Sequence, residues 1–326
     1  MVPATGGLDF TLHVQRQEAA RTHDAVNAIL SILFNGGSVS IHGSTLCQRR
    51  TVPITLGLLA ILLIGTALPA RGTASSVPSG TWSVAGSLGE ERSGASAVLL
   101  PDGRVLVTGG EGATGPLATS EMFLQDGFFT AAAPMLSARS SHVSMLLMDG
   151  KVLVAGGESP AGEPLASAEI YDPATDTWSL TGSMASPRFR FSASLLKDGR
   201  VLVAGGRTAH STLATLELFD PATGAFSIRE SFLSSPRESH AAAVLTDGRV
   251  LIVGGSDGTT QLTSVDLYDP ATDSISGGPA MAVGRTGHSL TKLLEGSVLV
   301  AGGYDGTGDL SSAELYRSSP ARSVDK

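Results

Sequence analysis

The chain has 326 residues, 42% of them hydrophobic and 16% charged, and this composition excludes a disordered tail protein. Residues 75–326 contain 17 Lys and Arg against 27 Asp and Glu, a net charge of −10, so they have no general electrostatic reason to bind nucleic acid or an anionic membrane. The single cysteine, Cys47, precedes this region, which therefore has no disulfide or thiolate chemistry available to it.

Residues 47–74 resemble a secretory signal. Arg49 and Arg50 precede an uncharged, mostly apolar run over residues 52–70, and small residues follow as far as Ala74. The pattern predicts a protein that is secreted or held in the periplasm or cell envelope. The alternative is an uncleaved membrane anchor formed by the apolar run, which would be the protein's one association with a membrane.

Residues 1–46 form an N-terminal extension of uncertain role, because they match nothing downstream and stand before the signal. We expect translation to start nearer Leu46, or the segment to be lost on processing. The third part of the chain, residues 75–326, is predicted to be one domain.

Within this domain one phrase recurs five times, as "PDGRVLVTGG", "MDGKVLVAGG", "KDGRVLVAGG", "TDGRVLIVGG" and "LEGSVLVAGG". The phrases end at glycines separated by 47, 49, 49 and 48 residues, namely Gly110, Gly157, Gly206, Gly255 and Gly303. A fixed period of this size indicates a repeat architecture. The repeats run approximately over residues 88–134, 135–183, 184–232, 233–281 and 282–326.

Each repeat is predicted to contain four short strands. In the third repeat, two apolar runs flank Asp198-Gly199, which is a strong hairpin signal, and the following "TLELFDPATGAFSI" supplies a second hairpin. Its strands are expected at residues 215–219 and 225–228. A four-stranded meander of about 48 residues buries its faces only when it stacks radially on its neighbours, and this predicts a β-propeller.

The Gly-Gly pairs, the acidic residue before an aromatic in "AEIYDPATDTW", "LELFDPATGAF", "VDLYDPATDSI" and "AELY", and Trp178 together resemble the kelch repeat. The resemblance covers about 245 residues and implies an all-β, five-bladed kelch-type propeller. The last repeat stops after its third strand, while "TWSVAGSL" aligns with the fourth strand "TWSLTGSM". We therefore expect the N-terminal strand, Thr81–Val84, to complete the last blade and close the ring.

Candidate ligand-binding residues recur in phase before the innermost strands. An arginine stands there in every repeat, as Arg92, Arg139, Arg188, Arg237 and Arg285. The resemblance to kelch domains places this position near the channel entrance. One interpretation is an anion site, since guanidinium forks suit carboxylate, phosphate or sulfate groups. The alternative is structural pairing with local carboxylates, among them Glu91, Glu238, Glu169, Glu217, Asp266 and Glu314.

Three histidines, His142, His240 and His288, follow their arginines at one offset, where Ala95 and Phe191 stand in the other repeats. They are candidates for ligand binding or for packing on the inner strand with a ring nitrogen bonded to a neighbouring blade. We expect neither a metal site nor another cofactor, because only three of five blades supply a histidine. A second basic set beside the Asp-Gly turns, Arg104, Lys151, Arg200 and Arg249, is expected to be solvated and self-neutralised.

The connections after each Gly-Gly pair diverge within the chain, whereas the turns of the opposite face are nearly uniform. Divergent loops on a rigid scaffold are typical of a recognition surface. We therefore expect an exported, monomeric, non-catalytic module that binds a protein, a peptide or a carbohydrate, with an anionic ligand as one candidate. A structural protein of the envelope that docks a larger partner is a related hypothesis.

The enzyme alternative is a carbohydrate-acting kelch protein similar to a sialic-acid epimerase. Copper-radical oxidases such as galactose oxidase share this fold, but their cofactor requires a tyrosine crosslinked to a cysteine, and residues 75–326 contain no cysteine. Glycosidase chemistry is disfavoured because the inner strands lack carboxylates in "SGASAVLL", "SSHVSMLL" and "ESHAAAVL". No catalytic residue is assigned.

Overall fold

The computed structural model describes residues 83–317, and the predicted leader and N-terminal extension lie outside this range. The described residues contain 21 β-strands and no helix, as the sequence predicts. It follows that no helix within this range has the length and apolar character needed to span a membrane.

Five sheets follow one another along the chain. Blade 1 contains β1 (Ser96–Leu99), β2 (Val105–Thr108), β5 (Ser120–Phe123) and β6 (Phe129–Ala132). Blade 2 contains β7 (Val143–Leu146), β8 (Val152–Ala155), β9 (Ala168–Asp172) and β10 (Thr177–Leu180). Blade 3 contains β11 (Ser192–Leu195), β12 (Val201–Ala204), β13 (Thr215–Asp220) and β14 (Ala225–Phe232).

Blade 4 contains β15 (Ala241–Val244), β16 (Val250–Val253), β17 (Val265–Asp269) and β18 (Ser274–Gly277). Blade 5 contains β19 (Ser289–Lys292), β20 (Val298–Ala301) and β21 (Ala313–Tyr316). A short hairpin of β3 (Glu111–Gly112) and β4 (Gly115–Pro116) decorates blade 1. The predicted five-bladed propeller of antiparallel meanders is confirmed.

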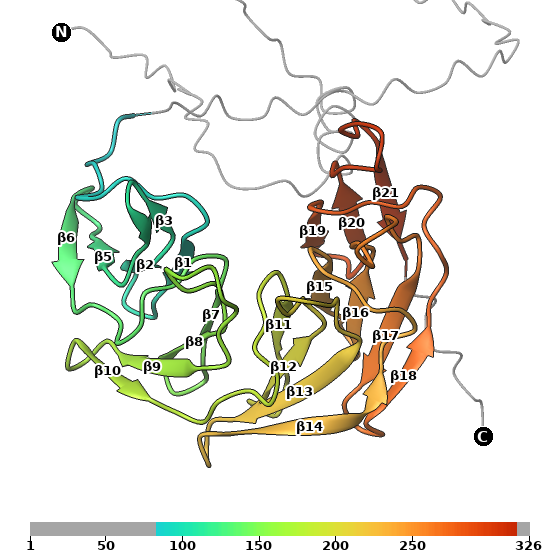
Figure 1. Ribbon diagram of the computed structural model, residues 1–326, viewed down its shortest axis with the longest axis horizontal. Coiled ribbons are helices and arrows are strands. Elements are labelled where there is room, and N and C mark those ends of the chain that lie inside the picture. The colour runs from blue at the N-terminus through green and yellow to red at the C-terminus, as the bar shows by residue number, and fades with distance from the viewer. Residues whose placement is uncertain (1–82, 318–326) are drawn as a thin grey trace, which may run out of the picture. The chain divides into compact units, whose positions relative to one another are not determined.

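The inner strands of neighbouring blades pack together, β1 with β7, β7 with β11, β11 with β15, and β15 with β19 (Figure 1). No comparable contact joins β19 to β1, although both strands are described. Leu99 in β1 is 63% exposed, and most of β19 is exposed as well. The five blades therefore form a propeller that is open between its first and last blades.

The expected closing strand is not present among the described residues. Thr81 and Trp82 lie outside them, and Ser83 and Val84 form no strand, with Val84 fully exposed. The segment that follows contacts blade 1 instead, where the Gly86 N–H donates to the Gly127 carbonyl at 2.8 Å. The fifth sheet consequently has three strands within residues 83–317.

The core lies between the blades and is built from the second strands. Every residue of β8, β12 and β16 is buried. Leu153 of blade 2, for example, packs in one cluster with Val203 and Phe219 of blade 3. These strands are runs of Val, Leu, Ile and Ala, which suit a sheet that is covered on both faces. Each blade is therefore more stable when it is packed against its neighbours than it would be as a separate sheet.

The Gly-Gly pairs allow neighbouring blades to approach closely. Gly205 has a φ of 59°, and a Cβ atom there would stand 2.5 Å from the Arg237 carbonyl oxygen of blade 4. Gly206 has a φ of 90°, and its Cβ would stand 2.7 Å from Cβ of Phe191 in its own blade. Only glycine meets both demands without strain.

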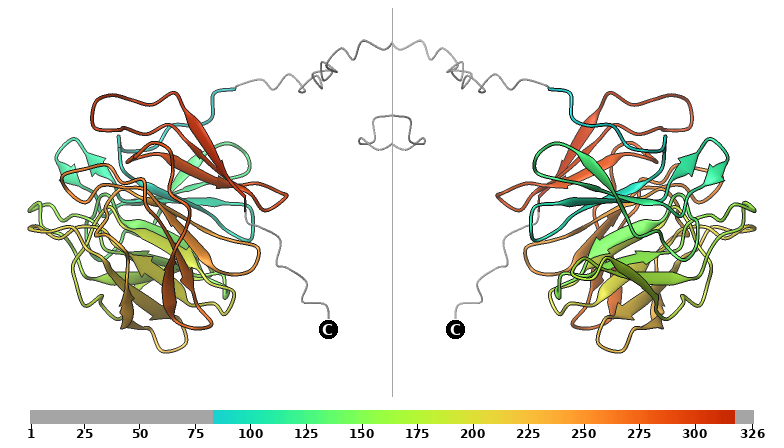
Figure 2. Two further views of the ribbon diagram at one scale, coloured as in Figure 1. Left: turned by 90° about the vertical axis from the view of Figure 1, so that its right-hand side faces the viewer. Right: turned by 90° about the vertical axis from the view of Figure 1, so that its left-hand side faces the viewer.

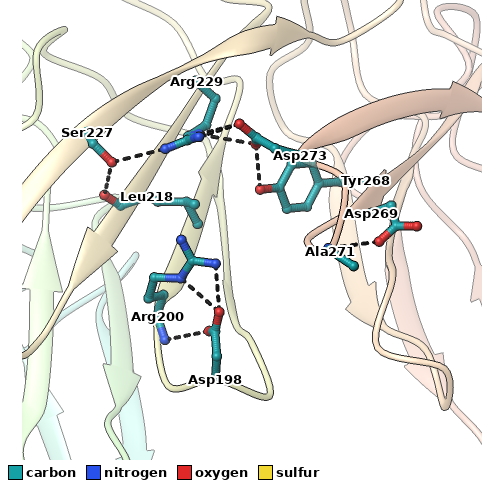
Figure 3. A network of polar contacts seen from close by, with 9 residues as sticks. All are labelled: Asp198, Arg200, Leu218, Ser227, Arg229, Tyr268, Asp269, Ala271 and Asp273. Carbon is teal, nitrogen blue, oxygen red and sulfur yellow. Dashed lines mark hydrogen bonds and ion pairs between the residues drawn. The ribbon is translucent and has the colours of Figure 1, made fainter.

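The outer-strand ends of blades 1, 2 and 3 are bonded to the second hairpin turn of the following blade. In blade 3 the outer strand β14 runs to Phe232, four residues beyond its predicted end, with an irregular register against β13. This extension carries Arg229, whose guanidinium bonds the Asp273 carboxylate of blade 4, which also accepts the Tyr268 hydroxyl at 2.9 Å (Figure 3).

The opposite ends of the blades carry different connections. The loops after the Gly-Gly pairs lie at the same end of the blades. In Figure 2 this end is recognised by the short teal β3–β4 hairpin that projects from it. At the other end lie the tight hairpin turns, where Arg200 bonds Asp198 with Nη2 at 2.7 Å (Figure 3). Arg104 and Arg249 pair with Asp102 and Asp247 in the same way, whereas Lys151 pairs with Asp172.

Candidate functional site

The five in-phase arginines lie inside the blades. Each stands just before an inner strand and sends Nη1 back to the carbonyl of the first glycine of its Gly-Gly pair, at 2.7 to 2.9 Å. Each Nη1 also donates to a carbonyl at the start of the third strand. The arginine thus bridges the loop that leaves the second strand and the strand that returns from it.

Each guanidinium also pairs with a carboxylate of the third strand. Arg139 meets Glu169 at 2.8 Å and Arg237 meets Asp266 at 2.7 Å, with all four side chains fully buried. The other pairs are Arg92–Glu121, Arg188–Glu217 and Arg285–Glu314. Burial lowers the pKa of Arg139, Arg188 and Arg237, and the paired carboxylates oppose that shift.

The same carboxylates hold the backbone that enters each blade. Glu169 accepts the N–H of Leu136 at 2.6 Å and that of Ser137 at 3.0 Å. This geometry corresponds to the structural alternative, in which the arginines are part of the scaffold. Glu238, in contrast, pairs with Arg207 and Arg190 and not with its neighbour Arg237. A ligand-binding role for the five arginines stays a prediction.

The three in-phase histidines lie between blades. Nε2 of His142 bonds the Thr108 hydroxyl of blade 1 at 3.0 Å, and Nε2 of His240 bonds the Ser192 hydroxyl of blade 3 at 2.8 Å. Burial, aided by the nearby arginine charge, lowers the pKa of each of these two histidines to about 3.

His288 is buried in the same way, but its ring nitrogens have no hydrogen-bond partner among the described residues. The corresponding positions of blade 4 are Ala241 and Val253, which carry no hydroxyl. The interpretation of the histidines as packing residues bonded to a neighbouring blade therefore holds for two of the three. Ligand binding by any of them stays a prediction.

Five residues with a left-handed backbone conformation line the mouth of the propeller, that is, the loop end of its inner strands, two positions after each arginine. They are Gly94, Ser141, Arg190, Ser239 and Gly287, with φ between 49° and 64°. Backbone bonds link neighbours: the Ser239 N–H donates to the Arg190 carbonyl at 2.9 Å, and the Gly287 N–H donates to the Ser239 carbonyl at 2.9 Å. Serine and glycine suit this conformation better than a long side chain does.

Blade 3 departs from this pattern and places a charged cluster on the mouth. The guanidiniums of Arg190 and Arg207 lie 5.4 and 5.8 Å from the ring centroid of Phe189. Both also approach the Glu238 carboxylate, Arg207 with Nη1 at 3.3 Å and Arg190 with Nη1 at 3.8 Å. We call these four residues the Phe189 cluster. It lies on the loop face, where the Phe189 and Arg207 backbones pair.

The remainder of the mouth is small, polar or acidic. The backbone bridges that correspond to Phe189–Arg207 within the other blades are Ser93 with Glu111, Ser140 with Glu158, Glu238 with Ser256, and Thr286 with Tyr304. A pocket beside Ser239 and Gly287 is bounded by Tyr304 and Asp309. Within residues 83–317, no three His, Cys, Asp or Glu side chains are arranged to hold a metal ion.

Sequence reasoning missed the Phe189 cluster, although the sequence contains a signal for it. After the in-phase arginine, four repeats read Ser-Gly, Ser-Ser, Glu-Ser and Thr-Gly, whereas the third reads Phe-Arg. An arginine where every other repeat has glycine or serine marks this position as unusual. The convergence of Arg207 on the same carboxylate is visible only in the structure.

A comparison with protein families finds that the model described as the KLHDC2/KLHL20/DRC7 Kelch-repeats domain matches residues 129–303. This match covers more than half of the chain and includes all of blades 2, 3 and 4. No curated protein matches the chain significantly.

Proposed function

We propose that this chain, which belongs to the kelch-repeat family, is an exported, non-catalytic module. Kelch propellers generally mediate protein–protein binding, and we propose that this one binds a peptide segment of a partner at the channel mouth and the loop face. One observation carries the proposal. The side chains of the in-phase arginines and histidines are buried within the scaffold, whereas the residues that differ between repeats lie at the mouth.

The geometry gives less support to a carbohydrate-acting enzyme. His142 and His240 are buried, with pKa values lowered to about 3, so neither exchanges protons readily near neutral pH. The carboxylates of the third strands are engaged with arginines and backbone N–H groups. These groups support the fold and are poorly placed to act on a sugar.

The proposal is tested by selecting peptides from a displayed random library against the immobilised full chain and measuring their dissociation constants by fluorescence anisotropy. Tyr304→Ala removes an exposed side chain of the mouth, and Met148→Ala removes one from the hairpin-turn end. We expect at least tenfold weaker binding for Tyr304→Ala and no change for Met148→Ala. The reverse order, or the absence of any selected peptide, contradicts the proposal.

Two further measurements address export and catalysis. Mass spectrometry of a selected peptide after long incubation with the protein should show no change, and any conversion contradicts a non-catalytic role. N-terminal sequencing of the exported protein should find a start after residue 74, and a retained Met1 contradicts removal of the leader.

A further inference from the structure

We propose that the Phe189 cluster is the anchor of this binding site and takes a carboxylate side chain, Asp or Glu, of the partner peptide. The proposal rests on the proposed function, since it names the chemistry that one part of the mouth recognises. Three features support it: the unused hydrogen-bond donors of the cluster, its charge, and the backbone conformation of Arg190.

The cluster holds donors without acceptors. No hydrogen bond of the Arg190 guanidinium is found within residues 83–317, because its ion pair with Glu238 spans 3.8 Å. Glu238 is only 6% exposed, and its Oε2 atom, which accepts no hydrogen bond there, lies 3.8 Å from Nη1 of Arg190. The exposed donors of Arg190 can therefore bond an acceptor that a ligand supplies.

The charge of the cluster favours a ligand with a single negative charge. Two guanidiniums face one carboxylate, which leaves one positive charge in a domain whose net charge is −10. A carboxylate neutralises this excess and matches the planar fork of Arg190, whose side chain is 52% exposed. A phosphate would bring a second negative charge beside Glu238 and would be repelled by it.

The conformation of Arg190 indicates that the site is formed before the ligand arrives. Arg190 has a φ of 53°, an unfavourable backbone conformation for a long side chain, where the other blades have serine or glycine. Phe189 packs beside both guanidiniums and restricts them further. An arginine kept at a strained position, prearranged and largely accessible, has the properties of a recognition residue.

A peptide is favoured over an acidic polysaccharide because the cluster is a single point of charge. Across the rest of the mouth, Glu111 and Glu158 repel further negative groups. An acidic polysaccharide repeats its charge at every few ångströms and would meet these residues, whereas a peptide can carry one carboxylate between neutral residues. Phe189 is half-buried, and its accessible part can also contact an apolar side chain next to that carboxylate.

The test uses the full chain and fluorescein-labelled Gly-Leu-Glu-Leu-Gly amide, compared with the same peptide carrying Gln in place of Glu. Arg190→Ser introduces the residue that blades 2 and 4 carry at this position and relieves the strain, so it should fold at least as well. Arg249→Ser is the matched control, because it removes an exposed arginine from the opposite end.

We expect Arg190→Ser and the Gln peptide each to weaken binding at least tenfold, and Arg249→Ser to leave it unchanged. Equal losses in both variants would indicate general electrostatic attraction and would overturn the proposal. The proposal is also overturned if the Glu peptide does not bind, or if oligogalacturonate or inorganic phosphate displaces it at lower concentration than free propionate does. Library-selected peptides that bind Arg190→Ser normally would leave the proposed function standing and remove only this anchor.

Discussion

Blades 3 and 5 carry the same motif but lie in different surroundings. In both, an arginine donates to a glycine carbonyl at 2.8 Å and to a third-strand carboxylate, at 2.5 Å in blade 3 and at 3.0 Å in blade 5. Glu217 is buried between neighbours on both sides, whereas the Glu314 side chain, next to the open end of the propeller, is 27% exposed. We therefore expect the neighbouring blades, which keep water away from the ion pair, to determine how much stability is lost when the pair is broken.

The largest expected effect comes from breaking the buried pair of blade 3. Arg188→Leu leaves the Glu217 carboxylate buried without its partner, and we expect a loss of about 3–5 kcal/mol in the free energy of unfolding. Arg285→Leu should lose clearly less, because water reaches Glu314. Urea unfolding followed by circular dichroism measures both.

A double variant serves as the control for this pair. Arg188→Met with Glu217→Leu removes both charges and should recover part of the stability that Arg188→Leu loses, since no charge is left buried without a partner. The recovery should be incomplete, because the Ala185 N–H and the Gly205 carbonyl also lose their side-chain partners. Equal losses in Arg188→Leu and Arg285→Leu would contradict the dependence on neighbours.

A second prediction concerns the glycines that separate the blades. Gly205 and Gly302 have similar positive φ values, 59° and 67°, so replacing either with alanine should cost about 1 kcal/mol through backbone strain. A Cβ at Gly205 meets the Arg237 carbonyl oxygen at 2.5 Å, whereas at Gly302 the nearest atom is 3.8 Å away. We therefore expect a further loss of about 1–3 kcal/mol only in Gly205→Ala, seen as a lower urea midpoint.

The same two variants show whether the propeller is open beside blade 5. If Gly302→Ala loses as much stability as Gly205→Ala, another segment packs against Gly302 in solution and the propeller is closed there. This pair of variants therefore tests the open end of the propeller directly.

The third prediction is a loss of stability in acid that comes from the blade interfaces. The pKa of His142 and that of His240 are lowered to about 3 in the folded protein, below the ordinary value of about 6.5. The unfolded chain therefore takes up more protons as the pH falls from about 6.5 towards 3, and stability falls with it, by about 2 kcal/mol for each histidine at pH 5.

His240→Phe tests this origin, because Phe191 already occupies the equivalent position of blade 3. Combined with Ser192→Ala, which removes the hydroxyl that bonds His240, it should reduce the pH dependence between pH 7 and pH 5 without unfolding the protein. Urea midpoints measured across this range give the slope, and an unchanged slope would show that other groups cause the loss.

The features that the sequence predicted are periodic or local. The hairpins, the Gly-Gly pairs and the pairing of Arg139 with Glu169 recur in phase, so one repeat predicts the others. The open end, the long strand β14 and the Phe189 cluster each depend on contacts between residues far apart in the chain. They also depart from the repeat, and a departure shows that a position is unusual without showing what it contacts.

The last prediction has the smallest effect, and it concerns a motif that depends little on its neighbours. Arg200 of blade 3 and Arg104 of blade 1 each fold back on the Asp of their own hairpin turn, with Nη2 2.7 Å from the carboxylate. Such exposed pairs contribute less than about 0.5 kcal/mol, because solvent screens the charges. Arg200→Ala and Arg104→Ala should therefore both lose little, although Arg200 lies in the middle of the propeller and Arg104, in an end blade, also donates to the Pro173 carbonyl of blade 2 at 3.3 Å. A larger loss of stability in Arg200→Ala would show that even the exposed hairpin turns are stabilised by the neighbouring blades. The difference expected between Arg188→Leu and Arg285→Leu would then be a property of the whole blade and not of its buried ion pair.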